Sequence, residues 1–163
     1  MPADLERTVA ELEKRERALV FASFDNDDAW VLGSLVLAIA QARDLAIVVS
    51  IRRGGQLLFH YARPGTTPDN DAWVARKSRV AERFHESSFL IRQRCAADGR
   101  TFEERSRLNP DEYAAHGGAV PIRVAGVGVV GSLTVSGLPD YQDHEVACEA
   151  IETYLRDRAG KVR

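Results

Sequence analysis

Hydrophobic positions recur at helical spacing in four stretches of the chain. The first, over about residues 4–20, has a narrow apolar stripe between charged positions and predicts an amphipathic helix on the outside of the domain. Residues 27–42 are apolar almost all round, which is typical of a helix that is buried on several sides. The other two are a long helix from about residue 70 through Phe84, with its continuation to Cys95 left open, and a last helix over residues 142–158.

Runs rich in β-branched residues predict two β-hairpins. The first joins residues 46–51 to 56–61 through a turn at Gly54-Gly55, and the second joins 119–124 to 127–135. In the last run an apolar face is expected opposite a face of small and polar residues. The apolar positions are Val127, Val129, Leu133 and Val135. Helices that alternate with hairpins predict an α/β (α+β) fold, with an antiparallel four- to five-stranded sheet flanked by helices in one domain over residues 1–163.

Composition narrows the classes of partner. The formal net charge is −2, so the chain lacks the basic excess of a nucleic-acid-binding protein, and we expect no nucleic acid partner. The two cysteines, Cys95 and Cys148, are isolated, which argues against a disulfide framework and a four-ligand zinc site. The charged N-terminal stretch does not resemble a signal peptide, and no apolar run reaches the roughly 20 residues of a membrane span. We therefore expect a soluble, cytoplasmic protein without a membrane partner.

A glycine-rich segment matches the sequence of a dinucleotide-binding motif but not its structural context. Gly126-Val-Gly128-Val-Val-Gly131 fits GxGxxG, which binds a dinucleotide when a helix begins directly after it. Here the sequence continues as a strand, so the glycines are interpreted as a hairpin turn with close packing.

Two places carry residue types suited to a ligand. Trp73 and Lys77 are one helical turn apart with Arg76 between them, so the ammonium group can lie near the ring or near a bound anion. The alternative is a core tryptophan covered by the lysine stem. His116 precedes Gly117-Gly118 on a loop, where ligand-binding residues tend to lie, although a simply exposed histidine fits the same position.

The sequence offers few residues suited to binding haem, binding a metal or acting as a nucleophile. Haem iron needs an axial ligand in an apolar slot, and the candidates are His60 (beside Tyr61) and His116. The cluster Asp140, Asp143, His144 and Glu145 begins the last helix, where capping explains it better than a metal site, so we expect no metal. No serine or cysteine has a neighbouring base, and no catalytic residue is nominated.

Several motifs together resemble a known family. They are "HGGAVPI" from His116, "GSLTVSG" from Gly131 and "DHEVA" from Asp143, with "FDNDDAWVLG" and "PGTTPDNDAWVARK" in the N-terminal half. This pattern resembles the haem-degrading-domain superfamily of haem-binding protein S and the glycolate-operon protein, in its longer, uncharacterised UPF-type branch. The resemblance implies a profilin-like or sensor-domain-like sheet flanked by helices, assembly as a homo-oligomer, and haem as a candidate cofactor. Its pattern positions are Trp73, Lys77, Gly118, Pro121, Gly131, Ser136 and Gly137.

These observations favour an oligomeric protein that binds a small ligand, with haem as one candidate, over an enzyme. The predicted pocket lies between the sheet and the helix that carries Trp73 and Lys77. The candidate ligand-binding residues are Trp73, Arg76, Lys77, His116 and Ser136. One alternative is an enzyme that degrades haem or processes a small acid. Another is a structural or interaction protein without a ligand.

Overall fold

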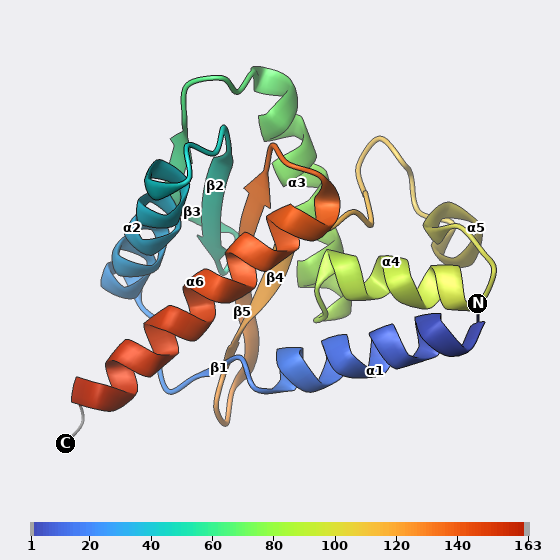
Figure 1. The fold of residues 1–163 in the computed structure, drawn as a ribbon, viewed down its shortest axis with the longest axis horizontal. Coiled ribbons are helices and arrows are strands. Elements are labelled where there is room, and N and C mark those ends of the chain that lie inside the picture. The colour runs from blue at the N-terminus through green and yellow to red at the C-terminus, as the bar shows by residue number, and fades with distance from the viewer. Residues whose placement is uncertain (1, 162–163) are drawn as a thin grey trace.

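The computed structural model describes residues 2–161 and is a five-stranded sheet with helices on both faces (Figure 1). The helices are α1 (Pro2–Arg17), α2 (Asn26–Ala42), α3 (Pro68–Phe84), α4 (Ser88–Ala97), α5 (Phe102–Ser106) and α6 (Asp140–Lys161). The strands are β1 (Val20–Phe21), β2 (Val48–Arg53), β3 (Gln56–Ala62), β4 (Ala119–Val124) and β5 (Gly128–Ser136). Across these described residues, no helix has both the length and the apolar character that crossing a membrane requires. The predicted α/β class is confirmed.

The sheet has the strand order β1-β4-β5-β2-β3. Both predicted hairpins are present, β2 with β3 and β4 with β5, and β2 pairs antiparallel with β5 in the centre. The fifth strand was not predicted: Val20 and Phe21 lie parallel to Arg123 and Val124, where we had expected the end of the first helix. Two residues are too few to show a strand pattern, so only the tertiary pairing reveals β1.

The hydrophobic core lies between the sheet and the helices α2 and α6 (Figure 1). Leu133 and Val135 of β5 point into this core, as predicted. The prediction was wrong for Val127, which is 72% exposed in the β4–β5 turn, and Val129 does not pack against the core whereas Val130 does. A register shift near the start of β5 changes the alternation, because one extra residue moves the following side chains to the other face.

The small polar face of β5 is buried under α3 rather than left in water. Ser132, Thr134 and Ser136 are all at most 3% exposed. The Ser132 hydroxyl donates to Glu82 Oε1 of α3 at 2.9 Å. Small residues thus allow α3 to approach the sheet closely, which places Trp73 and Lys77 beside the end of β5.

The open question about the long helix is answered by a break after Phe84. His85 adopts a left-handed conformation with φ of 58°, and Ser87 caps a new helix by accepting a hydrogen bond from the Leu90 N–H at 3.1 Å. The glycine-rich segment is indeed a turn: Gly126 and Gly128 have φ of 74° and 108°. A Cβ on Gly131 would lie 1.8 Å from the Arg52 carbonyl oxygen, so this glycine allows close strand packing.

Candidate ligand-binding site

A polar pocket of about 230 Å³ lies where α3, the segment before β4 and the β5–α6 turn meet. Trp73 and Lys77 come from α3, and His116 and Gly117 lie just before β4. The other wall is the end of β5 and the start of α6. The full lining is Asn70, Trp73, Lys77, His116, Gly117, Ser136, Gly137, Leu138, Asp140 and Asp143. Segments far apart in the sequence therefore form one site.

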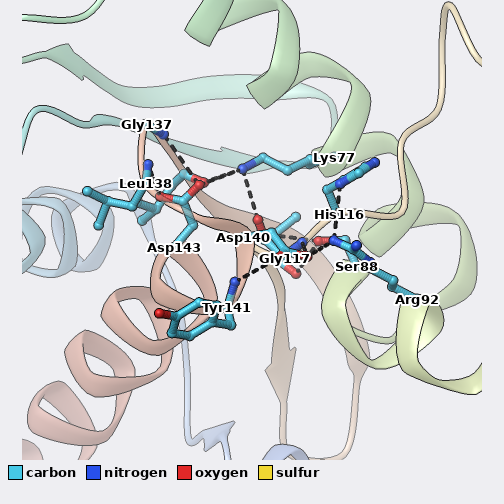
Figure 2. A network of polar contacts seen from close by, with 12 residues as sticks. Lys77, Ser88, Arg92, His116, Gly117, Gly137, Leu138, Asp140, Tyr141 and Asp143 are labelled. Atoms are coloured by element: carbon cyan, nitrogen blue, oxygen red, sulfur yellow. Dashed lines mark hydrogen bonds and ion pairs between the residues drawn. The ribbon is translucent and has the colours of Figure 1, made fainter. Parts of the chain in front are cut away.

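Lys77 holds the walls of this pocket together (Figure 2). Lys77 is 2% exposed. Its ammonium group donates to the Gly117 carbonyl at 3.0 Å, the Val135 carbonyl at 2.7 Å and Asp143 Oδ2 at 3.2 Å. A lysine has three N–H donors, and all three are used here. Lys77 therefore joins the segment before β4 to β5 and α6, and it does not offer a free donor to a ligand.

Asp143 is the buried partner of that ammonium group. Its carboxylate also accepts hydrogen bonds from the backbone N–H groups of Gly137, at 3.3 Å, and Leu138, at 3.0 Å. Burial raises the pKa of Asp143 to about 6, although the positive charge of Lys77 acts in the opposite direction. Burial likewise lowers the pKa of Lys77, against the attraction of Asp143. With a pKa of about 6, the Asp143 carboxylate is ionised at pH 7 and takes up a proton on mild acidification.

Two glycines of the family pattern make this geometry possible. Gly118 has φ of 134°, and a Cβ there would lie 2.2 Å from the Val135 carbonyl oxygen and 2.6 Å from Lys77 Nζ. Gly137 has φ of 145°, and its Cβ would lie 2.2 Å from the Ala46 carbonyl oxygen. Any side chain at either position would collide with backbone and adopt a disfavoured conformation. These glycines are therefore structural supports of the pocket.

Another pattern position, Pro121, has a different reason. It lies within β4, paired with Ser132 of β5. On its other side β1 pairs only with Arg123 and Val124, so Pro121 lies where the ladder towards β1 is already absent. The missing N–H of proline therefore costs no hydrogen bond between these strands.

His116 and Asp140 meet at the mouth of the pocket. Arg92 of α4 forms an ion pair with Asp140 and lies 3.3 Å from His116 Nδ1 (Figure 2). Burial, and then the charge of Arg92, lower the pKa of His116, so the imidazole is neutral at pH 7. With Nδ1 facing a donor, the ring proton belongs on Nε2. The Trp73 ring packs edge-on against the imidazole with centroids 5.1 Å apart.

The predicted site residues are only partly brought together. Trp73, Lys77, His116 and Ser136 all line the pocket. Arg76 does not: its guanidinium group lies over the Trp73 ring, 4.5 Å from the centroid, and donates to the Pro110 carbonyl.

Sequence reasoning missed other residues of the pocket. The pocket residue Asn70 had no signal in the sequence, and neither had Arg92, which contacts Asp140 and His116 from outside the lining. Asp140 and Asp143 were recognised, but as helix caps. Asp140 accepts a hydrogen bond from the adjacent Tyr141 N–H at 3.0 Å, which is not the pattern of a helix cap, and Asp143 accepts from the backbone N–H groups of Gly137 and Leu138 before the helix.

The acidic cluster at the start of α6 is dispersed. Asp143 pairs with Lys77, and Glu145 pairs with Arg15 at 2.6 Å. His144 is buried, with Nε2 3.4 Å from Cys148 Sγ, and burial lowers its pKa to about 4. Over residues 2–161, no three histidine, cysteine or acidic side chains gather in a way that could hold a metal ion.

A second hollow, an open groove of about 580 Å³, lies between α2 and β3 and contains His60. It is more apolar than the pocket, and its rim includes Trp30, 69% exposed, and Tyr61, 49% exposed. His60 Nε2 lies 2.7 Å from Asp71 Oδ1. The two histidines proposed as haem ligands, His60 and His116, thus lie in different hollows. The groove's lining is Trp30, Ser34, Leu37, Ala38, Gln41, Leu58, Phe59, His60 and Tyr61.

Fold and site define the class of protein: an α/β domain with a buried Lys–Asp pair under a small polar pocket at one end of its sheet. The chain belongs to the family described as "Haem degrading protein HbpS-like", whose model matches residues 24–152. It is 58% identical to a UPF0303 protein of Streptomyces coelicolor over 148 residues, which are 91% of this chain and 94% of the relative. A UPF0303 protein of Serratia proteamaculans is 43% identical over 88% of this chain and 89% of its own length.

Solved structures share the fold. The crystal structure of the Ybr137w protein superposes with a TM-score of 0.85 at 30% identity, and covers 93% of this chain and 89% of its own. The crystal structure of a PduOC:haem complex superposes with a TM-score of 0.68 at 20% identity, over 80% of this chain and 94% of that one. HbpS gives 0.64 at 17% identity, over 83% and 92%. At these lower identities the likeness concerns the fold alone.

Proposed function

We propose that this protein binds a small ligand rich in acceptor oxygens, such as a short carboxylic acid, in the pocket between α3 and α6. The proposal rests on which polar groups of the pocket have no hydrogen-bond partner among the described residues. The carboxylates of Asp140 and Asp143 already have partners. The Asn70 amide N–H groups, the Trp73 indole N–H and the Ser136 hydroxyl make no hydrogen bond as donors to any residue between 2 and 161. With the His116 Nε2–H, the unused groups are donors, which favours an acceptor-rich ligand.

The size of the pocket limits the ligand. Pockets for drug-sized molecules measure about 300–1,000 Å³, and this one measures about 230 Å³. A molecule of a few heavy atoms fits that volume. Since all three N–H bonds of Lys77 are engaged, its amine is not available as a nucleophile, so the site supports binding more directly than catalysis. Processing of a small acid stays as the alternative.

Calorimetric titration with glycolate, oxalate, pyruvate and inorganic phosphate tests this proposal. Saturable binding of at least one is expected, and His116→Ala and Ser136→Ala should each weaken it by about tenfold, the loss of one hydrogen bond of about 1.4 kcal/mol. The exposed His85→Ala, away from the pocket, is the control. Absence of binding by all four probes, or equal binding by the pocket variants, would contradict the proposal.

A second candidate is haem, and the groove between α2 and β3 fits it better than the polar pocket. Haem requires an apolar slot with an axial ligand. The groove supplies Trp30, Phe59 and Leu37, and the axial candidate His60 borders it on edge strand β3, with its ring turned towards Asp71 of α3. A ligating histidine usually has a carboxylate at its other ring nitrogen, and Asp71 is in contact with the His60 ring. The HbpS-like family name and the haem complex of the PduOC neighbour also support the candidate. Haem would supply iron-based redox chemistry to the groove.

Haem titration followed by absorption spectroscopy separates the two hollows. A Soret shift that is lost in His60→Ala and kept in His116→Ala places haem in the groove; the opposite pattern, or no shift, refutes this assignment. Incubating the haem-loaded protein with a reductant tests haem degradation, since an active enzyme bleaches the Soret band. Light scattering of the same sample tests the predicted homo-oligomer, with the exposed Trp30 beside edge strand β3 as its proposed contact.

A further inference from the structure

A third hollow, of about 370 Å³, is lined by residues of α1, α4, β4 and the segment between α3 and α4. None of its lining residues belongs to the ligand pocket or to the groove described above. Its lining is almost entirely charged: Glu13, Glu16, Arg17, Glu86, Leu90, Arg94 and Arg123. We refer to it as the α1–α4 cavity.

Glu16 is the unusual residue of the α1–α4 cavity. It is only 9% exposed, and its Oε1 accepts a hydrogen bond from the Ser87 N–H at 2.6 Å. Its second oxygen, Oε2, is buried and has no hydrogen-bond partner among residues 2–161. A buried polar atom without a partner costs about 1–3 kcal/mol, and more when it is charged, so it calls for an explanation. Burial, and the nearby charge of Glu86, raise the pKa of Glu16.

The positive groups around Glu16 differ in how far they are already paired. Arg94 forms ion pairs with both Glu13, at 2.6 Å, and Glu86, so these three charges are matched among themselves. Arg123 donates one N–H to the His85 carbonyl at 2.7 Å and keeps further donors. Arg17 makes no hydrogen bond or ion pair with any other residue of the described chain. What is left over is one buried acceptor and two guanidinium groups.

We propose that the α1–α4 cavity is a second binding site, for a small zwitterion with a primary ammonium group and a carboxylate. The ligand's ammonium group pairs with the Glu16 carboxylate, and its carboxylate binds the guanidinium groups of Arg123 and Arg17. Each end of such a ligand meets the opposite charge, and guanidinium groups suit carboxylates because their N–H groups match both oxygens. This site is independent of the function proposed for the other two hollows.

Calorimetric titration of the full chain with unbranched ω-amino acids, from glycine to 6-aminohexanoate, tests the proposal. At least one member is expected to bind saturably, because the series samples the distance between the two charged ends. Butylamine and butyrate, which each carry one of the two charges, should bind at least about tenfold more weakly, the equivalent of about 1.4 kcal/mol. Failure of the whole series to bind, or equal binding of butylamine, overturns the zwitterion site.

Variants tie the binding to the proposed residues. Glu16→Gln keeps an acceptor for the Ser87 N–H and removes the charge, so it should weaken the best ligand by about tenfold or more. Arg17→Gln should also weaken it, and this exposed residue can be changed without disturbing the interior. Glu6→Gln, on an exposed position of the same helix, is the matched control and should bind as the wild type does. Unchanged affinity in both Glu16→Gln and Arg17→Gln would show that binding occurs elsewhere.

Discussion

Replacing Lys77 by methionine is the sharpest test of the architecture around the pocket. The substitution keeps the length of the apolar stem and removes the ammonium group. Three acceptors then lose their donor: the Gly117 and Val135 carbonyls and Asp143 Oδ2. Because Lys77 and Asp143 are both about 2% exposed, water cannot replace the lost interactions.

The expected loss follows from the buried pair. Removing one partner of such a pair typically costs about 3–5 kcal/mol, a large part of a total folding stability of about 5–15 kcal/mol. The wild-type pKa of Asp143 is raised to about 6, and without Lys77 it rises further. A carboxyl whose pKa is higher in the folded than in the unfolded state binds protons preferentially when folded. It therefore favours folding at low pH, and that contribution is lost as pH rises through the folded-state pKa. The loss in Lys77→Met should thus be larger, by about 2–3 kcal/mol, at about pH 8 than at about pH 5.

Urea unfolding at the two pH values, followed by circular dichroism, measures this. The double variant Lys77→Met/Asp143→Asn should have lost the added pH dependence, because asparagine does not titrate. Lys14→Met, at an exposed position of α1, is the control and should change stability by less than about 0.5 kcal/mol. A loss below about 1 kcal/mol, or one of equal size at both pH values, would show that Lys77 is not the buried support inferred here.

Three further predictions are tested by the same unfolding assay. Burial lowers the pKa of His144 to about 4, so the neutral histidine stabilises the fold at neutral pH and this contribution is lost as pH falls. His144→Gln should therefore be less destabilised relative to wild type near pH 4.5 than near pH 7, by up to about 1.4 kcal/mol per pH unit. A difference that does not change with pH would contradict this. Gly118→Ala should lower the free energy of unfolding by more than about 3 kcal/mol, because its Cβ would lie 2.2 Å from the Val135 carbonyl oxygen. Gly54→Ala, whose Cβ would have nothing within 4 Å, is the control and should lower it by about 1 kcal/mol. Similar losses of stability in the two variants would refute the steric argument. Tyr154→Phe removes the 2.7 Å hydrogen bond that the Tyr154 hydroxyl donates to the buried Asp28 carboxylate of α2, and should lower the free energy of unfolding by about 1–2 kcal/mol. Unchanged stability would show that Asp28 does not need this hydrogen bond.

The fold class could be predicted from the sequence because its signals are local. Helical spacing marked residues 27–42, and β-branched runs on either side of Gly54-Gly55 marked the first hairpin, which the structure confirms as β2 and β3. The same local patterns could not reveal β1, which depends on pairing with residues about a hundred positions later, between Val20 and Arg123. They also could not predict the register shift in β5, because the partner strand determines it.

The candidate site, like the fold, could be predicted from the sequence only in part. The sequence by itself determined which residue types were available: Trp73 and Lys77 on one helical turn, His116 on a loop, and glycines where backbones approach closely. Only the tertiary structure decided that Lys77 faces Asp143, that Arg76 lies outside the pocket, and that the two candidate histidines lie in separate hollows. The physical reason is that pairing and burial of charge depend on contacts between distant segments, whereas spacing along the chain reports only which face of its own helix or strand a residue occupies.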